Sequence, residues 1–580
     1  MRLPLREYWN LLSTYLAPQR RRVALLTIML FAGIAAQLVN PLIVRAFIDQ
    51  ATARRPLDSL LTLAVLFLAV GLVAQGLAVV ETWIAENVGW MATNELRGDL
   101  ALHCLRLDLS FHNARTPGEL IERVDGDVTA LANFFSRFVI NILGNLLLML
   151  GALALLFSVN WQVGGALSLF VAVALWTMMR VRAIAVPYWK QVREESAQFF
   201  GFIGEQLSGT EDLRSAGAKD FVLRRMAELM RRWLRKQFRS GLAGYSMHAS
   251  SLILFTTGNA IAFALAAWLF RGGAITIGTA YLIFQYTELL RRPVEQIRTQ
   301  MQDLQLAGAG IERIKELLST QAAIVAGHGH SLPDGPLSVE VEQLHFSYNG
   351  VDPILRNISF QLAVGKVLGV VGRTGSGKTS LARLLVRLYE PQSGRIRLGG
   401  VDVRDANLDD LRQRVGVVTQ EVQLFHATTR DNITLFDDAI PEERVLAALR
   451  DVGLEEWYGA LPNGLETVLD SGHSLSAGQA QLLAFARVLL RDPGLVILDE
   501  ASSRLDPASE IRLQRTMDTL LAGRTGVVVA HRLATLQHAD QILVIEDGRI
   551  REHGDRLTLA ADPTSRYAEL LRAGLELVTI

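Results

Sequence analysis

The stretch Gly372-Arg373-Thr374-Gly375-Ser376-Gly377-Lys378-Thr379 follows an apolar run, 367–371, and precedes an apolar segment of helical spacing, 381–388. A glycine-rich loop between a strand and a helix is the setting of a phosphate-binding loop. Its glycines let successive backbone N–H groups turn toward one anion at a helix N-terminus. We therefore predict a nucleotide site in which Lys378 contacts the outer phosphates and Thr379 ligates Mg²⁺. The residues expected to bind the nucleotide here are Gly372, Thr374, Gly375, Ser376, Gly377, Lys378, Thr379 and Ser380.

The composition indicates a membrane protein. Half of the 580 residues are hydrophobic, and the mean hydropathy is +0.25, which is too apolar for an ordinary soluble protein. The chain holds 58 basic and 58 acidic residues, so it shows no excess of positive charge for binding nucleic acid. The single cysteine, Cys104, has no partner for an internal disulfide, and we expect an ordinary buried thiol.

Six apolar segments precede residue 300, at residues 23–44, 60–80, 138–159, 161–179, 241–270 and 274–294. A helix needs about 20 residues to cross the hydrocarbon core. We therefore predict a multi-pass protein with six spans that contact membrane lipids.

Basic residues set the expected orientation of these spans. They gather before the first span and in the connections between spans two and three and between spans four and five. The opposite side holds only Arg45, Arg54, Arg55 and Arg271. Because basic residues stay on the inner side of a membrane, we expect both termini to be cytoplasmic.

The two inner connections are long, and each is interrupted near its middle. The first is interrupted at Phe111-His112-Asn113-Ala114-Arg115-Thr116-Pro117-Gly118 and the second at Leu207-Ser208-Gly209-Thr210. Two antiparallel helices of about 25 residues would extend the spans about 35–40 Å into the cytoplasm. The alternative is a pair of independently folded cytoplasmic loops.

Residues 321–336 form a linker rich in Ala, Gly, His and Pro. Strand-like and helix-like segments alternate after it, which predicts an α/β domain. In that domain the run Leu495-Val496-Ile497-Leu498 ends in Asp499 and Glu500. Asp499 is placed to hold Mg²⁺, and Glu500 to orient or polarise the water that attacks the γ-phosphate.

The peptide Leu475-Ser476-Ala477-Gly478-Gln479 resembles the signature peptide of ATP-binding cassette (ABC) proteins. The resemblance implies that Tyr348 stacks on adenine and that Gln420, after a strand at 415–419, senses Mg²⁺ and contacts the membrane domain. It implies that Ser503-Arg504-Leu505-Asp506 lies at a dimer interface. It also implies that His531 contacts the γ-phosphate.

The membrane half resembles the exporters of that family in which the spans and the cassette share one chain. The implied fold is an all-α six-helix transmembrane domain, 1–320, with long cytoplasmic coupling helices, a linker, 321–336, and an α/β P-loop cassette domain, 337–580. The implied activity is an ATPase that exports or flips hydrophobic or amphipathic molecules by alternating access, with ATP and Mg²⁺ as cofactors. The expected location is the bacterial inner membrane. A second half-transporter is implied as a partner, because each ATP would lie between one chain's phosphate loop and the other chain's Ser476, Gly478 and Gln479.

Two departures from the family pattern concern the dimer. Ala477 stands where the family usually has glycine, and residues 480–483 replace an arginine-bearing continuation. Arg504 stands where a small residue is usual. In exporters of this family built from two different chains, such a signature often accompanies an intact catalytic glutamate. We therefore predict a heterodimer, with a homodimer that tolerates alanine as the alternative.

The sequence leaves three other functional classes as alternatives. They are a nucleotide-gated channel or regulatory subunit, a membrane-anchored ATPase that does mechanical or assembly work, and an importer permease. Intact Glu500 and His531 argue against the first, and the six spans with their paired inner connections argue against the second. Importers usually keep the spans and the cassette on separate chains. Within the last span, Glu288, Arg291 and Arg292 are expected to face a wet cavity or one another, because charges facing lipid are costly.

Overall fold

The computed structural model describes residues 13–137, 142–324, 329–469, 475–499, 507–530 and 536–576. Its contacts divide the chain into two compact units. The helical unit comprises Met1–Leu105 and Pro117–Thr320, and the α/β unit comprises Arg106–Thr116 and Gln321–Ile580. A short piece of the predicted first inner connection is therefore part of the α/β unit.

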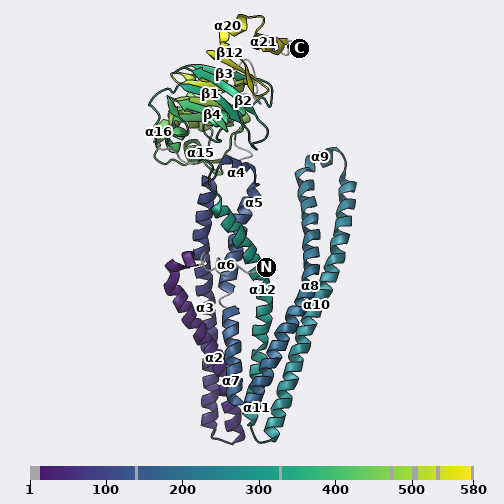
Figure 1. The fold of residues 1–580 in the computed structure, drawn as a ribbon. Coiled ribbons are helices and arrows are strands. Elements are labelled where there is room, and N and C mark those ends of the chain that lie inside the picture. Colours follow the sequence, from purple (N-terminus) through teal and green to yellow (C-terminus); the bar gives the residue numbers. More distant parts are fainter. Residues whose placement is uncertain are drawn as a thin grey trace. The chain divides into compact units, whose positions relative to one another are not determined.

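The helical unit is built from long helices (Figure 1). They follow a 3₁₀ turn, η1 (Ala17–Gln19), and a π-helical turn, η2 (Glu122–Gly126), lies among them. The helices are α2 (Arg20–Thr52), α3 (Leu57–Arg106), α5 (Pro117–Ile121), α6 (Asp127–Arg137), α7 (Asn145–Val159), α8 (Trp161–Ser208), α9 (Thr210–Ser215), α10 (Lys219–Arg271), α11 (Ile277–Leu289) and α12 (Arg291–Ser319).

Within the described residues, five helices are long and apolar enough to cross a membrane. They cover Ser13–Thr52, Leu57–Arg106, Ile142–Val159, Trp161–Ser208 and Lys219–Arg271. The start of the predicted third span, at 138–141, lies outside the described residues. Each of the first five predicted spans thus has a helix of suitable length and composition.

The sixth predicted span is divided at Leu290 into α11 and α12. Pro293 is the third residue of α12. Proline is tolerated in a first helical turn, where the backbone N–H has no partner within the helix, and its missing N–H removes the hydrogen bond to Leu289 that a continuous helix would form here. The 13 residues of α11 rise about 20 Å, so a crossing by the sixth segment stays a prediction.

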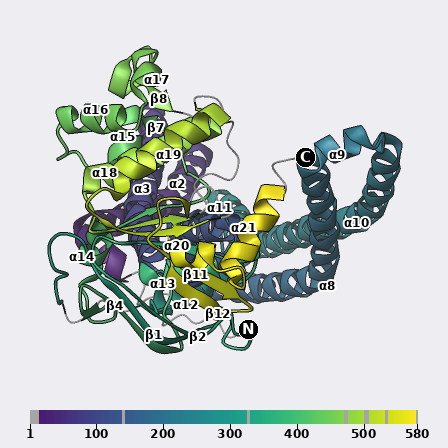
Figure 2. The same cartoon turned by 90° about the horizontal axis from the view of Figure 1, so that it is seen from above.

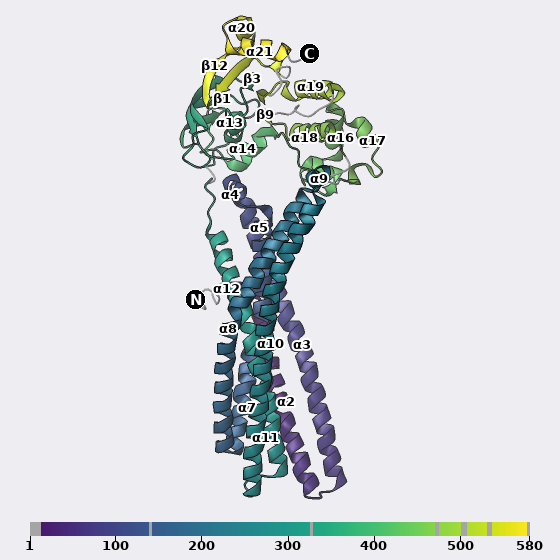
Figure 3. The same cartoon turned by 90° about the vertical axis from the view of Figure 1, so that its right-hand side faces the viewer.

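Helices α8 and α10 run side by side for most of their length (Figure 3). With 48 and 53 residues, they are roughly 70–80 Å long, more than twice the thickness of a hydrocarbon core. The short helix α9 connects them. Helix α8 ends before it at Ser208, where the sequence predicted an interruption, and α10 begins after it at Lys219. The second inner connection is therefore a pair of extended helices.

The N-terminal end of α11 is fixed to α2. Asp49 accepts hydrogen bonds from the Gly278 nitrogen and the Thr276 hydroxyl, both at 2.9 Å. A Cβ atom at Gly278 would lie 2.5 Å from the Arg45 carbonyl oxygen, so only glycine permits this approach. Farther along α11, the fully buried Tyr286 donates to the Leu38 carbonyl at 2.8 Å. These bonds set the rotation of α11 relative to α2.

The α/β unit contains two main sheets. One has the order β2-β1-β4-β5 and is antiparallel. The other has the order β12-β11-β3-β10-β9-β6 and is parallel except for its edge strand β12. The strands are β1 (Val339–Phe346), β2 (Leu355–Leu362), β3 (Val367–Val371), β4 (Ser393–Leu398), β5 (Val401–Asp402), β6 (Val415–Val418), β9 (Leu495–Asp499), β10 (Thr525–Val529), β11 (Gln541–Glu546) and β12 (Arg549–Asp555), with a small pair, β7 (Ala427–Thr428) and β8 (Val468–Leu469).

The helices of this unit cover the parallel sheet and form a separate cluster beside it. Figure 2 shows α15, α16 and α17 gathered around the β7–β8 pair, next to α18 and α19. The helices are α4 (Leu109–Asn113), α13 (Lys378–Leu385), α14 (Leu408–Arg414), α15 (Thr429–Thr434), α16 (Glu442–Asp451), α17 (Glu455–Gly459), α18 (Ala477–Arg491), α19 (Pro507–Leu521), α20 (Arg556–Ala561) and α21 (Arg566–Glu576), with a 3₁₀ turn, η4 (Gly464–Glu466).

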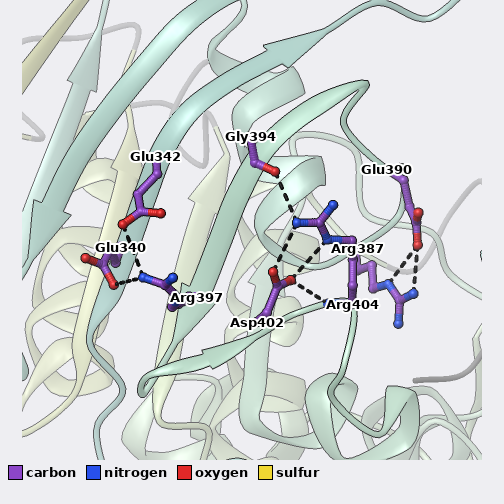
Figure 4. Close-up of polar contacts among 8 residues, drawn as sticks. All are labelled: Glu340, Glu342, Arg387, Glu390, Gly394, Arg397, Asp402 and Arg404. Atoms are coloured by element: carbon purple, nitrogen blue, oxygen red, sulfur yellow. Dashed lines mark hydrogen bonds and ion pairs between the residues drawn. The ribbon is translucent and has the colours of Figure 1, made fainter. Parts of the chain in front are cut away.

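Ion pairs hold the antiparallel sheet and its loops (Figure 4). Arg397 on β4 pairs across the strands with Glu340 at 3.0 Å and Glu342 at 3.2 Å on β1. In the next turn Arg404 contacts Asp402 at 3.1 Å. Burial tends to raise the pKa of Asp402, but the hydrogen bonds from Arg404 outweigh it and leave that pKa lowered. Such partly exposed pairs contribute little each, and only the pairs made by Arg397 cross between strands, where they join β4 to β1.

Candidate nucleotide site

The parallel sheet brings the sequence motifs to one edge. Strands β3, β10, β9 and β6 are neighbours and run in the same direction. Their carboxyl ends therefore lie together, which is where ligands bind in such sheets. The phosphate loop follows β3, Asp499 ends β9, and Gln420 follows β6.

The phosphate loop turns sharply into α13, a helix of eight residues. Gly375 and Gly377 have φ angles of 83° and 105°, which strongly favour glycine. Lys378 is buried and donates from Nζ to the carbonyls of Gly372 at 2.8 Å and Arg373 at 3.0 Å. The buried Ser376 Oγ has no hydrogen-bond partner among the described residues. The loop thus holds a buried ammonium group and a hydroxyl without a described partner at the place where a phosphate would bind.

A cavity of about 520 Å³ lies at this loop. Its lining unites residues that the sequence predicted separately, namely Tyr348, Thr374, Gly375, Gly377, Lys378, Thr379, Ser380 and Gln420, together with Ile354. The Thr379 hydroxyl also donates to Asp499 Oδ1 at 3.2 Å. Hydroxyl, carboxylate and amide oxygens are ligands that Mg²⁺ prefers, so the residues present fit the predicted metal.

Tyr348 stands at the rim of the cavity in a group of three aromatic rings. Its hydroxyl lies 2.9 Å from Ser380 Oγ. Its ring meets the rings of Phe346 and Tyr389 edge to face, with centroids 4.8 and 5.0 Å away. Tyr348 itself is 46% exposed. A supported and exposed ring suits the predicted stacking on an adenine base.

Tyr389 links this group to the short segment Arg106–Thr116. The Asn113 side chain on α4 donates to the Tyr389 hydroxyl at 2.6 Å. Burial raises the pKa of Tyr389, although the bond from Asn113 lowers it. Sequence reasoning missed both residues. The signal available was the interruption at 111–118, but nothing in the pattern showed which residue it would contact.

The signature peptide begins α18. Ser476 is its N-cap, and Ser476 and Gln479 form a reciprocal capping box, which satisfies two backbone donors. Ala477 is exposed, whereas Gly478 is buried. Gln481 is also buried and donates to the Thr419 carbonyl at 3.3 Å. The helix is thereby tied to the residue before Gln420.

Several predicted residues lie outside the described part of the chain: Glu500, Ser503, Arg504, Asp506 and His531. The strands that lead to them are described. Strand β9 ends at Asp499, one residue before Glu500, and β10 ends at Val529, two residues before His531. The roles of these residues stay predictions.

Comparison with known proteins identifies the family. A model of the ABC transporter transmembrane region matches residues 23–294, and one of the ABC transporter domain matches residues 355–503. An uncharacterized ABC transporter ATP-binding protein of Bacillus subtilis, YknV, is 31% identical over 587 residues, which cover 98% of this chain and 94% of the relative. The chain belongs to the ABC transporter family.

Further relatives place it among the exporters. An ATP-dependent lipid A-core flippase of Pectobacterium atrosepticum is 28% identical and covers 98% of the chain and 97% of the flippase. A probable multidrug resistance ABC transporter of Bacillus subtilis, YheH, is 30% identical over 80% of the chain and 70% of its own length. A bacterial Atm1-family ABC exporter with ATP bound has a TM-score of 0.79 at 26% identity, covering 96% of this chain and 98% of that one. These matches confirm the fold class and the ATP-driven exporter activity that the resemblance implied.

Proposed function

We propose that the exporter binds and hydrolyses ATP at the cavity described above and uses it to export or flip hydrophobic or amphipathic molecules. The observation that carries this proposal is the shared lining of one cavity by Tyr348, the phosphate loop and Gln420. Tyr348 would stack on the base, Lys378 would contact the outer phosphates, and Glu500 and His531 would act at the γ-phosphate. The functions for which the flippase and the multidrug relative are named support cargo of this kind.

Mg²⁺ is proposed as the metal, held by Thr379, Asp499 and Gln420. The contact between Thr379 and Asp499 already brings two oxygen atoms together at 3.2 Å. When bound, the ion would neutralise phosphate charge. The domain limits 1–320 and 337–580, with the linker between them, are proposed on the sequence alone.

The experiment that tests this function is transport by the reconstituted exporter. Vesicles that contain the exporter would be assayed for transport of a panel of lipids, peptides and dyes. The stimulation of ATP hydrolysis by each compound would be measured in parallel. Uphill movement that requires ATP and stops in the Lys378→Ala variant supports the proposal. ATP-dependent conductance without net pumping would support a nucleotide-gated channel instead.

Membrane topology gives a second prediction. The distribution of basic residues places Arg54 and Arg271 outside the cell, with His112 and Gly209 and both termini inside. Cysteines would be introduced singly at these four positions in a Cys104→Ala background. In sealed cells, an impermeant maleimide should label positions 54 and 271 and spare positions 112 and 209. Labelling at 112 or 209 would contradict the six-span arrangement.

A dimer is proposed because the signature residues belong to the ATP site of a second chain. Ser476 and Gly478 would complete the partner's site, and the partner would complete the site at Lys378. In the most apolar window of α3 no residue is buried. This leaves an apolar surface for a partner as well as for lipid.

We propose further that the partner is a different chain. Ala477 lies at the exposed first position of α18, so its methyl group is presented to whatever approaches this helix N-terminus. A Cβ atom there hinders close approach of a phosphate to the backbone. The altered signature would therefore serve the less active of two ATP sites.

The partner prediction is tested by expressing the chain alone and together with candidate half-transporters. We expect stable, transporting dimers only in co-expression, with about one ATP hydrolysed per dimer in a single turnover. Ala477→Gly provides the matched variant, since it restores the usual residue without changing the helix cap. A stable homodimer with full transport and two equivalent hydrolysing sites would contradict the heterodimer.

A further inference from the structure

A second cavity, of about 760 Å³, lies in the helical unit between α2, α3 and α11. Drug-sized ligands occupy cavities of roughly 300–1,000 Å³. Five polar side chains from the three helices line it: Gln37, Asn40, Gln75, Gln285 and Glu288. The remaining lining is apolar and consists of the aromatic ring of Phe67 and several small or aliphatic residues. A polar cavity on helices that are otherwise apolar indicates a binding site.

The helical spacing turns these polar groups toward one space. Gln37 and Asn40 are three residues apart on α2, and Gln285 and Glu288 are three residues apart on α11, so each pair shares a helix face. The bond from Tyr286 to the Leu38 carbonyl, at 2.8 Å, holds the two helices in this rotation. The Asn40 Oδ1 atom has no hydrogen-bond partner among the described residues. One buried acceptor among the lining residues is therefore not used within the described chain.

Glu288 gives the cavity its charge. It is the one ionisable group among the described residues that line the cavity. The Asn259 side chain on α10 donates to its Oε1 atom. The nearby Arg291 pairs instead with Glu295 at 3.3 Å and lies over the Phe255 ring at 5.8 Å. The predicted pairing with Arg292 lies outside the described side chains. In the predicted sixth span, a carboxylate that lines a cavity indicates a functional site.

We propose that this cavity binds the exported cargo and that Glu288 selects organic cations over anions of the same shape. The carboxamides of Gln37, Asn40 and Gln75 would exchange hydrogen bonds with polar groups of the cargo, and Phe67 would contact its apolar part. A cation is also attracted to an aromatic face. This inference rests on the proposed export function.

If Glu288 had only a structural role, that role would be to accept the hydrogen bond from Asn259, which joins α11 to α10. Glu288→Gln separates the two roles, because glutamine has the same shape and its carbonyl oxygen still accepts from Asn259. Only the negative charge is lost. Glu295→Gln is the matched control, since Glu295 binds Arg291 and Ser251 and is absent from the cavity lining.

The test uses tetraphenylphosphonium and tetraphenylborate, which share one shape and carry opposite charges. The dimer would be reconstituted in lipid nanodiscs, and ATPase stimulation and direct binding would be measured for both ions. We expect the wild-type exporter to prefer the cation. The Glu288→Gln variant should raise the half-stimulating concentration of the cation by about fivefold, and Glu295→Gln should leave it unchanged.

Three outcomes would overturn this inference: equal response to both ions, no response to the cation, or an unchanged preference in Glu288→Gln. The proposed export function would still stand after any of these outcomes, provided that the exporter moves another cargo in the panel assay in an ATP-dependent way. Loss of all transport from the panel would instead count against the proposed function itself.

Discussion

Lys378→Ala is expected to lower ATP hydrolysis by on the order of 100-fold, as removal of one preorganised charge-stabilising donor does in other enzymes. Lys378 is buried, and its Nζ donates to the carbonyls of Gly372 and Arg373. An outer phosphate would take over these hydrogen bonds, and alanine offers none. The defect should therefore appear in ATP binding, measured with a fluorescent nucleotide on the dimer.

The matched control is Lys366→Ala. Lys366 lies directly before β3, is exposed, and pairs with Asp540 at 2.9 Å. It is not among the residues that line the cavity. Its variant should bind ATP as the wild type does. Normal ATP affinity in Lys378→Ala would remove this lysine from phosphate binding.

Glu500→Gln should also stop turnover, but by a different route. Glutamine cannot act as a base toward the attacking water, so ATP should stay bound and hold the dimer closed. Nucleotide retention after gel filtration separates the two variants. Near-normal steady-state hydrolysis, in a dimer with no other competent site, would exclude the role proposed for Glu500.

The nucleotide site was predictable from the sequence because its main determinants are local. The glycines, Lys378 and Thr379 form one continuous loop, and their order alone fixes a strand, a turn and a helix. Asp499 and Gln420 end or follow other apolar runs, and parallel pairing carries them to the same edge. The order of apolar runs and polar residues was therefore enough to predict the nucleotide site, even though its residues lie far apart in the chain.

The parts that the sequence did not reveal depend on packing between distant segments. The sixth apolar segment looked continuous, but the helix breaks at Leu290, just before the first turn that contains Pro293. For Glu288, Arg291 and Arg292 the sequence left two alternatives, a wet cavity or contacts with one another. The position and shape of the cavity were not predictable, because they depend on how α2 and α3 lie against α11. The partner of Asn113 is 276 residues away, and no periodicity records such a contact.

That contact leads to the last prediction, which concerns coupling. The segment Arg106–Thr116 belongs to the α/β unit, while the chain on either side of it continues into the helical unit. Within the α/β unit, Asn113 donates to Tyr389, whose ring meets Tyr348, which in turn contacts Ser380 beside the phosphate loop. A nucleotide base that binds against Tyr348 would therefore act, through Tyr389 and Asn113, on the segment that continues into the spans.

Asn113→Leu and Tyr389→Phe should each lower the amount of cargo moved per ATP hydrolysed by about tenfold, the upper range for one net hydrogen bond. Both changes keep the local volume nearly constant, and the double variant should be no worse than either single one, because the two residues share one interaction. Tyr458→Phe, a tyrosine elsewhere in the same unit, is the control and should keep the wild-type ratio. Transport and hydrolysis would be measured in the same vesicles. If Asn113→Leu and Tyr389→Phe each preserve the ratio, this hydrogen bond has no part in coupling and the α4 segment acts through packing alone.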